Sequence, residues 1–221
     1  MSVERDDFTY ERLGHASVRI ETPDGTVVYV DPWSEVLDGS PGDADVVFVT
    51  HDDRDHYDPD AIHAVASDAT VIATYEAIDT SDLDRSTVSL PADGEVMVEG
   101  IAVRTVSAYN RPDGEHLDDD GNPYHAPGEV VGLLLSTGST TIYYPSDTDF
   151  LEDHADLSAD VFIPPIGGHF TMDRHEAADF ARSVDPDLIL PVHYNTFEPI
   201  ETDAEAFAAE LNADGIAVVL F

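Results

Sequence analysis

The chain of 221 residues contains no cysteine and no lysine. Without cysteine it can form neither disulfides nor thiolate metal sites, so any metal must take histidine, carboxylate, amide or water ligands. Without lysine, its 9 basic residues are all arginines, and they are scattered along the chain. A nucleic acid partner needs a basic stripe that neutralises its phosphates, so we discount nucleic-acid binding.

Long apolar runs are absent as well. No stretch approaches the roughly 20 residues that span a membrane, and the N-terminal segment 1–7 is acidic and lacks an apolar signal core. We therefore expect a soluble, cytoplasmic protein with no membrane partner. The length suits a single domain over residues 1–221, and no linker-like stretch divides it. The oligomeric state is left open.

Acidic residues, in contrast, are abundant. The 47 Asp and Glu residues bring the formal net charge to -38. Repulsion within such a chain is screened only at high salt, so we interpret the charge as adaptation to a saline cytoplasm and infer a halophilic source. Most isolated Asp and Glu side chains are then expected to be solvated surface groups.

One segment combines histidine with aspartate, at His51, Asp53, Asp55 and His56. It follows the apolar run 46–49, whose β-branched and aromatic residues predict a buried strand. The segment therefore lies on the loop at the carboxyl end of a strand, where α/β sheets usually carry their chemistry. Its imidazoles and carboxylates could bind one or two divalent cations. On composition alone, a solvated acidic loop is the alternative.

The remaining pattern alternates short strands with helices and suggests sheets covered by helices on their outer faces. The polar segment 109–128 is too long for a hairpin and is a candidate active-site loop, whose acidic tract 118–122 does not fit the spacing of a calcium-binding EF-hand. Helices are expected at 59–66, 75–82, 151–157, 173–184 and 202–211, and strands at 8–13, 17–21, 26–30, 46–49, 70–74, 87–90, 95–98, 101–108, 129–136, 140–144, 160–163, 188–192 and 216–220.

Segment 50–56 resembles the first metal motif of the metallo-β-lactamase-fold hydrolase superfamily, His-x-His-x-Asp-His after a strand that ends in Thr. His51, Asp55 and His56 match this motif, whereas Asp53 stands where it has its second His. Segments 142–148, 165–172 and 190–197 resemble the later motifs of the branch that includes ascorbate-6-phosphate lactonase. The resemblance covers nearly the whole chain in family order. It implies an α/β fold, the four-layer αββα sandwich of that superfamily.

The resemblance also implies two metal sites that share one carboxylate. Asp147 aligns with the bridging aspartate and His193 with the last histidine ligand, so one site would be filled by Asp55, His56, Asp147 and His193. The other site keeps His51 and would use Asp53 and Asp147. Its last ligand would be Asn110, which aligns where many members place a histidine, or His125 from the candidate active-site loop.

Other residues are placed around these ligands. The resemblance sets His15 and Asp31 beside the metal pocket, and His125 or His169 could orient the substrate or its leaving group. We expect His63, His116, His154 and His175 to be surface groups. One or two divalent ions are implied; zinc is the first choice, and the oxygen donor Asp53 makes manganese or magnesium the alternatives.

Two function hypotheses follow. The first is a metal-dependent hydrolase that attacks an ester, lactone or phosphoester of a small-molecule substrate with a metal-activated water, with Asp55 and His193 as catalytic residues. The second is a non-catalytic protein that keeps the fold and binds metal or ligand, which the departures at Asp53 and Asn110 motivate. True β-lactamase activity is not expected, because the later motifs resemble the lactonase-like branch.

Overall fold

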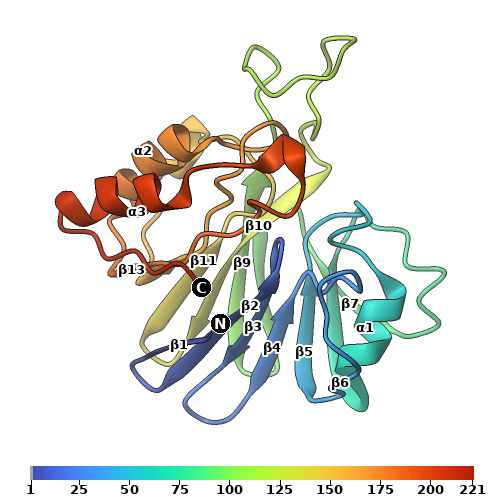
Figure 1. The fold of residues 1–221 in the computed structure, drawn as a ribbon. Coiled ribbons are helices and arrows are strands. Elements are labelled where there is room, and N and C mark those ends of the chain that lie inside the picture. The colour runs from blue at the N-terminus through green and yellow to red at the C-terminus, as the bar shows by residue number, and fades with distance from the viewer. Residues whose placement is uncertain (1) are drawn as a thin grey trace.

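The computed structural model describes residues 2–221 and consists of two β-sheets packed face to face (Figure 1). The first sheet has seven strands in chain order: β1 (Ser2–Arg5), β2 (Phe8–Gly14), β3 (Ser17–Glu21), β4 (Val27–Val30), β5 (Ala44–Val49), β6 (Ala66–Tyr75) and β7 (Thr87–Leu90). The second has six, in the order β13 (Leu188–Ile189), β12 (Val161–Phe162), β11 (Thr140–Tyr144), β10 (Val130–Thr137), β9 (Ile101–Ala108) and β8 (Gly94–Val98).

Each sheet begins with antiparallel strands and continues with parallel ones. In the first sheet β1 to β4 pair antiparallel and β4 to β7 pair parallel. In the second, β8 to β11 pair antiparallel and β11 to β13 pair parallel. Parallel strands bring their carboxyl ends to the same edge of a sheet, so the loops that follow β4, β5, β11 and β13 can meet.

Helices cover the outer faces of the sheets (Figure 1). Helix α1 (Pro59–Val65) packs on the first sheet, while α2 (Arg174–Val184) and α3 (Ala204–Ala213) lie side by side over the second. The side chains of Asp58 and Asp173 accept hydrogen bonds from backbone N–H groups at the starts of α1 and α2. These are donors that have no partner within the helix. The layers run helix, sheet, sheet, helix, so the prediction of an αββα sandwich is confirmed.

The apolar side chains form two cores. The larger lies between the sheets and includes Phe48 and Leu133, and the smaller lies between the second sheet and its helices and includes Phe162, Phe180 and Phe207. These cores hold the strand ends at fixed separations. None of the helices in residues 2–221 combines the length and the apolar character needed to cross a membrane.

Two predicted elements are wrong. Residues 76–82 form turns instead of a helix, because β6 extends to Tyr75 and the apolar side chains that follow, Ile78 and Leu83, enter the core separately. Residues 216–220 form no full strand; Val218 makes a single bridge to Ile189. The helix expected at 151–157 shrinks to the 3₁₀ turn η1 (Glu152–His154), and a second 3₁₀ turn, η2 (Glu198–Ile200), precedes α3.

Candidate metal centre

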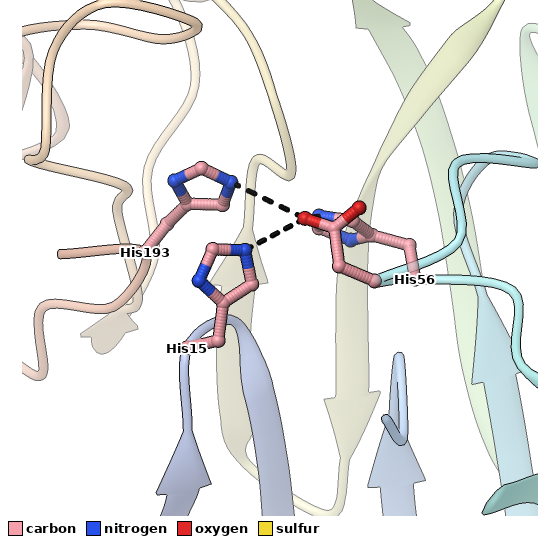
Figure 2. A group of neighbouring side chains, drawn as sticks. His15, His56 and His193 are labelled. Carbon is pink, nitrogen blue, oxygen red and sulfur yellow. Dashed lines mark hydrogen bonds and ion pairs between the residues drawn. The ribbon is translucent and has the colours of Figure 1, made fainter. Parts of the chain in front are cut away.

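Loops from both sheets converge at one edge of the sandwich. His51 and His56 follow β5, Asp147 follows β11, and His193 lies on the loop after β13. His15 occupies the turn between β2 and β3, and Figure 2 shows it beside His193, with dashed lines from both rings converging on one carboxylate oxygen, Oδ2 of Asp55. The chain therefore gathers at one place side chains that are up to 178 positions apart, between His15 and His193.

The first group of candidate ligands contains Asp55, His56, Asp147 and His193. Nε2 of His193 lies 3.1 Å from Oδ2 of Asp147, and Nε2 of His56 lies 3.5 Å from the same oxygen. Oδ2 of Asp55 lies 3.7 Å from Nε2 of His56 and 3.9 Å from Nε2 of His193. The structure thus brings together the four residues that the sequence assigned to one site.

The second group contains His51, Asp53 and His125, with Asp147 at its border. Oδ2 of Asp53 lies 3.7 Å from Nε2 of His51 and 3.2 Å from Nε2 of His125. Nε2 of His125 lies 3.6 Å from Oδ2 of Asp147. Asp147 therefore stands between the two groups, as a bridging carboxylate would.

These separations suit metal ligands better than they suit hydrogen bonds. Two ligand atoms about 2.1 Å from one tetrahedral ion lie roughly 3.4 Å apart, and most of the distances above are close to that value. Nε2 of His51 and Nε2 of His56 are buried and have no hydrogen-bond partner within residues 2–221. Buried polar atoms are normally satisfied, so two unpaired nitrogens that face carboxylates fit a divalent ion.

The electrostatics of the groups favour ionised carboxylates. Burial raises the pKa of Asp147, but the charges of His193 and His56 outweigh it and hold the pKa of this carboxyl well below its usual range. Burial lowers the pKa of His56, and three neighbouring carboxylates, Asp147 first, more than reverse this and raise the pKa. Several carboxylates thus surround the imidazole of His56 and stabilise a proton on it. A metal cation can replace that proton.

Asp31 and His15 hold two of the candidate ligands in place. Oδ2 of Asp31 accepts a hydrogen bond from Nδ1 of His56 at 2.8 Å, which leaves Nε2 of that ring to face the site. Nε2 of His15 lies 2.7 Å from Oδ2 of Asp55, and its Nδ1 lies 3.1 Å from Oγ1 of Thr196. Both residues lie beside the pocket, where the resemblance placed them. Such outer partners fix the orientation of ligands.

Asn110 differs from its expected place and is absent from both groups of ligands. Its Oδ1 accepts hydrogen bonds from the backbone N of His125 at 2.9 Å and from Nδ1 of His125 at 3.1 Å. Its Nδ2 donates to Oδ1 of Asp149 and to the carbonyl oxygen of Phe170. With both ends of the amide engaged, we interpret Asn110 as the residue that orients His125. The candidate ligand at this position is His125 itself, which is buried.

Sequence reasoning missed Asp149. This buried carboxylate accepts from Asn110 and lies 2.7 Å from Nδ1 of His116, so His116 is tied to the interior instead of standing free on the surface. His154 is also buried, stacked on Phe180 with ring centroids 5.1 Å apart. The signal for Asp149 was its spacing two positions beyond Asp147 on the same loop. His169 is exposed at the rim, where Nε2 lies 3.3 Å from the hydroxyl of Tyr124.

The backbone at this edge is left-handed at several residues other than glycine. His15, Asp31, Ser146 and His193 have φ angles of 50°, 46°, 61° and 52°. Residues that have a Cβ atom rarely adopt this backbone conformation. It turns the chain sharply at the end of a strand. The turns direct the four side chains inward.

A cavity of about 350 Å³ opens over the two groups of ligands. Candidate ligands form its floor, and aromatic rings and one arginine form its walls. Its lining comprises Trp33, Asp53, Arg54, Asp55, Tyr124, His125, Asp147, Phe170, His193 and Phe197.

Comparisons with known proteins identify relatives of this chain. Residues 9–193 match the model of the β-lactamase superfamily domain. A UPF0173 metal-dependent hydrolase of Methanopyrus kandleri is 32% identical, over 93% of this chain and 92% of the relative. Another from Thermus thermophilus is 30% identical, over 92% of this chain and 91% of the relative. The match covers nearly the full length of both relatives.

Solved structures show the same fold. A protein of Parabacteroides distasonis described as a candidate metal-dependent hydrolase superposes with a TM-score of 0.83 at 27% identity, covering 100% of this chain and 96% of that one. A metallo hydrolase of Ignicoccus hospitalis superposes with a TM-score of 0.76 at 22% identity over 96% of this chain and 94% of that one, a likeness of fold. The chain therefore belongs to the metallo-β-lactamase-fold UPF0173 family of metal-dependent hydrolases and is an enzyme of that class.

Proposed function

We propose that this enzyme hydrolyses an ester, lactone or phosphoester bond in a small-molecule substrate, with one or two divalent ions at the site. The observation that carries the proposal is the position of Asp147, whose Oδ2 lies within 3.6 Å of Nε2 atoms of His193, His56 and His125. A carboxylate shared by two groups of nitrogen and oxygen donors suits a dinuclear centre.

We assign the ligands as follows. Asp55, His56 and His193 would hold one ion together with Asp147, and His51, Asp53 and His125 would hold the other with the same carboxylate. Zinc is the first choice for the histidine-rich site. The oxygen donor Asp53 makes the second site harder and admits manganese or magnesium.

A bound divalent ion supplies Lewis acidity and lowers the pKa of water at the site. The protein groups do the rest. Neighbouring charge and the hydrogen bond with His15 outweigh burial and lower the pKa of Asp55, so this carboxylate is ionised and can accept the proton of the attacking water. The water oxygen bonds to the carbonyl carbon or phosphorus, the bond to the leaving oxygen breaks, and Asp55 returns the proton to that oxygen.

The remaining residues bind and orient. His193 belongs to the ligand set and faces Asp55 at 3.9 Å, so its loss should affect both metal retention and the position of the proton acceptor. His169 and Tyr124 stand at the rim, where a leaving group would exit. Their polar atoms can donate a hydrogen bond to it.

Two finer assignments belong to the same proposal. Within the superfamily we place the chain near the branch that includes ascorbate-6-phosphate lactonase, on the strength of the segments around Asp147 and His193. We also propose that it works in a highly saline cytoplasm, since a net charge of -38 would repel itself at low salt.

The test is a panel of esters, lactones and phosphodiesters, assayed at high salt with zinc, manganese and magnesium in turn. We expect turnover of at least one class that a chelator abolishes and that added metal restores. Turnover that survives complete removal of metal would overturn the proposal. Elemental analysis of protein purified without chelator should give two metal ions per chain, or one if only the histidine-rich site is filled.

A further inference from the structure

The walls of the active-site cavity are aromatic. Trp33, Tyr124, Phe170 and Phe197 line it above the candidate ligands. They come from four loops that are distant in the sequence, yet the rings of Tyr124 and Phe170 lie 4.8 Å apart and those of Phe170 and Phe197 lie 6.3 Å apart. Convergence of four rings on one cavity provides flat apolar surfaces against which a planar group can stack.

Phe197 adds a separate observation. Its side chain is 39% exposed, and within residues 2–221 only Met97 and Val219 are large apolar side chains that are comparably exposed. Neither of these lines the cavity. An apolar ligand that covers an exposed phenylalanine at the mouth of a pocket removes the ring from water, which stabilises the complex.

Arg54 is the cation of the cavity wall. Its side chain is exposed and, among residues 2–221, no carboxylate lies within 4.0 Å of it. Five of the nine arginines contact a carboxylate within 4.0 Å; Arg182, for example, contacts Asp179, Glu210 and Asp214. A free guanidinium at the mouth of the site can pair with an anionic group on a ligand.

The charge of the floor depends on metal. Asp53, Asp55 and Asp147 contribute three negative charges, which would repel an anion from the metal-free cavity. Two divalent ions would contribute four positive charges and reverse the sign of the floor. Arg54 would then add to a field that attracts anions, so an anionic substrate fits the dinuclear form of the site.

The volume limits the size of the ligand. The cavity of about 350 Å³ is near the lower end of the range for small-molecule pockets, about 300–1,000 Å³. It accommodates one ring with short substituents.

We infer that the substrate is a small anionic aryl ester or lactone, whose planar ring packs between Trp33, Phe170 and Phe197 and whose carboxylate or phosphate group pairs with Arg54. This inference rests on the proposed function, since it names the substrate class of the same site.

The binding test does not require turnover. Trp33 is the chain's single tryptophan, so quenching of its fluorescence reports occupancy of the cavity. Metal-loaded protein is titrated with benzoate, cyclohexanecarboxylate, benzamide and phenyl phosphate, at the lowest salt concentration at which circular dichroism shows the chain folded, because salt screens Arg54. We expect benzoate or phenyl phosphate to quench at several-fold lower concentration than the other two, and the stronger of the pair identifies the anion.

Substitutions in the cavity wall test whether the wall, and not the metal alone, binds the probe. Arg54→Gln should weaken binding of the anionic aryl probe about fivefold and leave benzamide unchanged. Arg104→Gln is the matched control, because Arg104 is also exposed, also lacks a carboxylate within 4.0 Å in the described chain, and lies on β9 outside the cavity. Phe170→Leu should reduce the preference for benzoate over cyclohexanecarboxylate, with Met97→Leu as its control.

Turnover forms the second arm, with carboxylated aryl esters compared against neutral alkyl esters of equal leaving-group pKa. Equal kcat/KM for both, unchanged by Arg54→Gln, would overturn the inference while the proposed function stands. Probe binding that depends on Arg54, with no turnover of any ester, lactone or phosphodiester in the full panel, would support the pocket assignment and refute the proposed function.

Discussion

Nε2 of His125 lies 3.2 Å from Oδ2 of Asp53, although the two residues are 72 positions apart. Asp53 occupies the place where the superfamily motif has its second histidine, and His125 comes from the long loop between β9 and β10. The imidazole of His125, from a distant loop, thus lies next to Asp53, the carboxylate at the motif's histidine position. The second group of ligands keeps two nitrogens in this way, from His51 and His125.

Removal of that imidazole should cost one metal ion. We expect His125→Ala to lower the metal content by about one ion per chain and to reduce kcat, while the ion held by Asp55, His56 and His193 stays. Elemental analysis after gel filtration measures this directly. His169→Ala is the matched control, since its imidazole stands at the rim and should leave metal content unchanged. Equal metal content in both variants would show that His125 is no ligand.

Asp147→Ala should affect both ions together. Its carboxylate faces His193, His56 and His125, so its loss removes a donor from each group. We expect metal content below one ion per chain and a fall in turnover of roughly a hundredfold or more. Asp120→Ala, at the exposed tip of the long loop, should behave like the wild type. If Asp147→Ala retains metal and hydrolysis, the ligand assignment is wrong.

Asn110→Leu tests the orientation of His125. The substitution removes the acceptor for Nδ1 of His125 and leaves buried Asp149 without one donor. We expect the affinity of the second site for metal to fall roughly 10- to 100-fold, the usual effect of losing an outer partner. Titration of the metal-free protein with zinc, read by competition with a chromophoric chelator, resolves the two sites. A change confined to the tighter site would contradict this role.

The strand ends near the ligands could be predicted from sequence, and the long loop could not. One and two residues, respectively, separate the apolar runs 46–49 and 142–144 from His51 and Asp147, so local pattern places both residues just beyond the ends of buried strands. The contact of Asn110 with His125 depends on how a 20-residue polar loop folds back, and no local periodicity encodes that. The helix predicted at 75–82 was wrong for a related reason, because the few apolar residues of this segment do not recur at helical spacing.

The prediction that His154 lies on the surface was wrong for a different reason. Nε2 of His154 lies 2.8 Å from the carbonyl oxygen of Ser107, and its Nδ1 accepts from the backbone N of Leu151, so the neutral ring is satisfied inside the core. Both partners are backbone groups, which carry no signature in the sequence. A polar residue among acidic neighbours was therefore interpreted as a surface group.

This burial makes stability depend on pH. Burial lowers the pKa of His154, whereas the unfolded chain binds its proton near pH 6.5. The unfolded state therefore takes up more protons as pH falls below about 6.5, and the free energy of unfolding should decrease from there down to the lowered pKa of the folded state. Chemical denaturation at several pH values tests this. His154→Gln, which keeps a donor and an acceptor, should lose less stability between pH 7 and 5; parallel curves would refute the role of His154.

Gly167→Ala should disturb the loop that carries His193. A Cβ atom at residue 167 would overlap the carbonyl oxygen of His193 and lie 2.9 Å from Cβ of Ile200. We expect the free energy of unfolding to fall by about 1–3 kcal/mol and kcat to fall as well. Gly94→Ala is the control, because its new Cβ meets mainly the ring of Pro91, and it should lose less stability and no activity. Thermal unfolding at saturating metal compares the two.

The left-handed turns at His15, Asp31, Ser146 and His193 carry a cost of about 1–2 kcal/mol for each residue. Glycine would remove that cost, but at His15, Asp31 and His193 it would also delete the side chain that the site uses. Selection for heat resistance alone would therefore favour glycine at these positions and erode the enzyme. Directed evolution toward a hardier catalyst should leave this edge of the sandwich untouched and seek its gains in the outer helices.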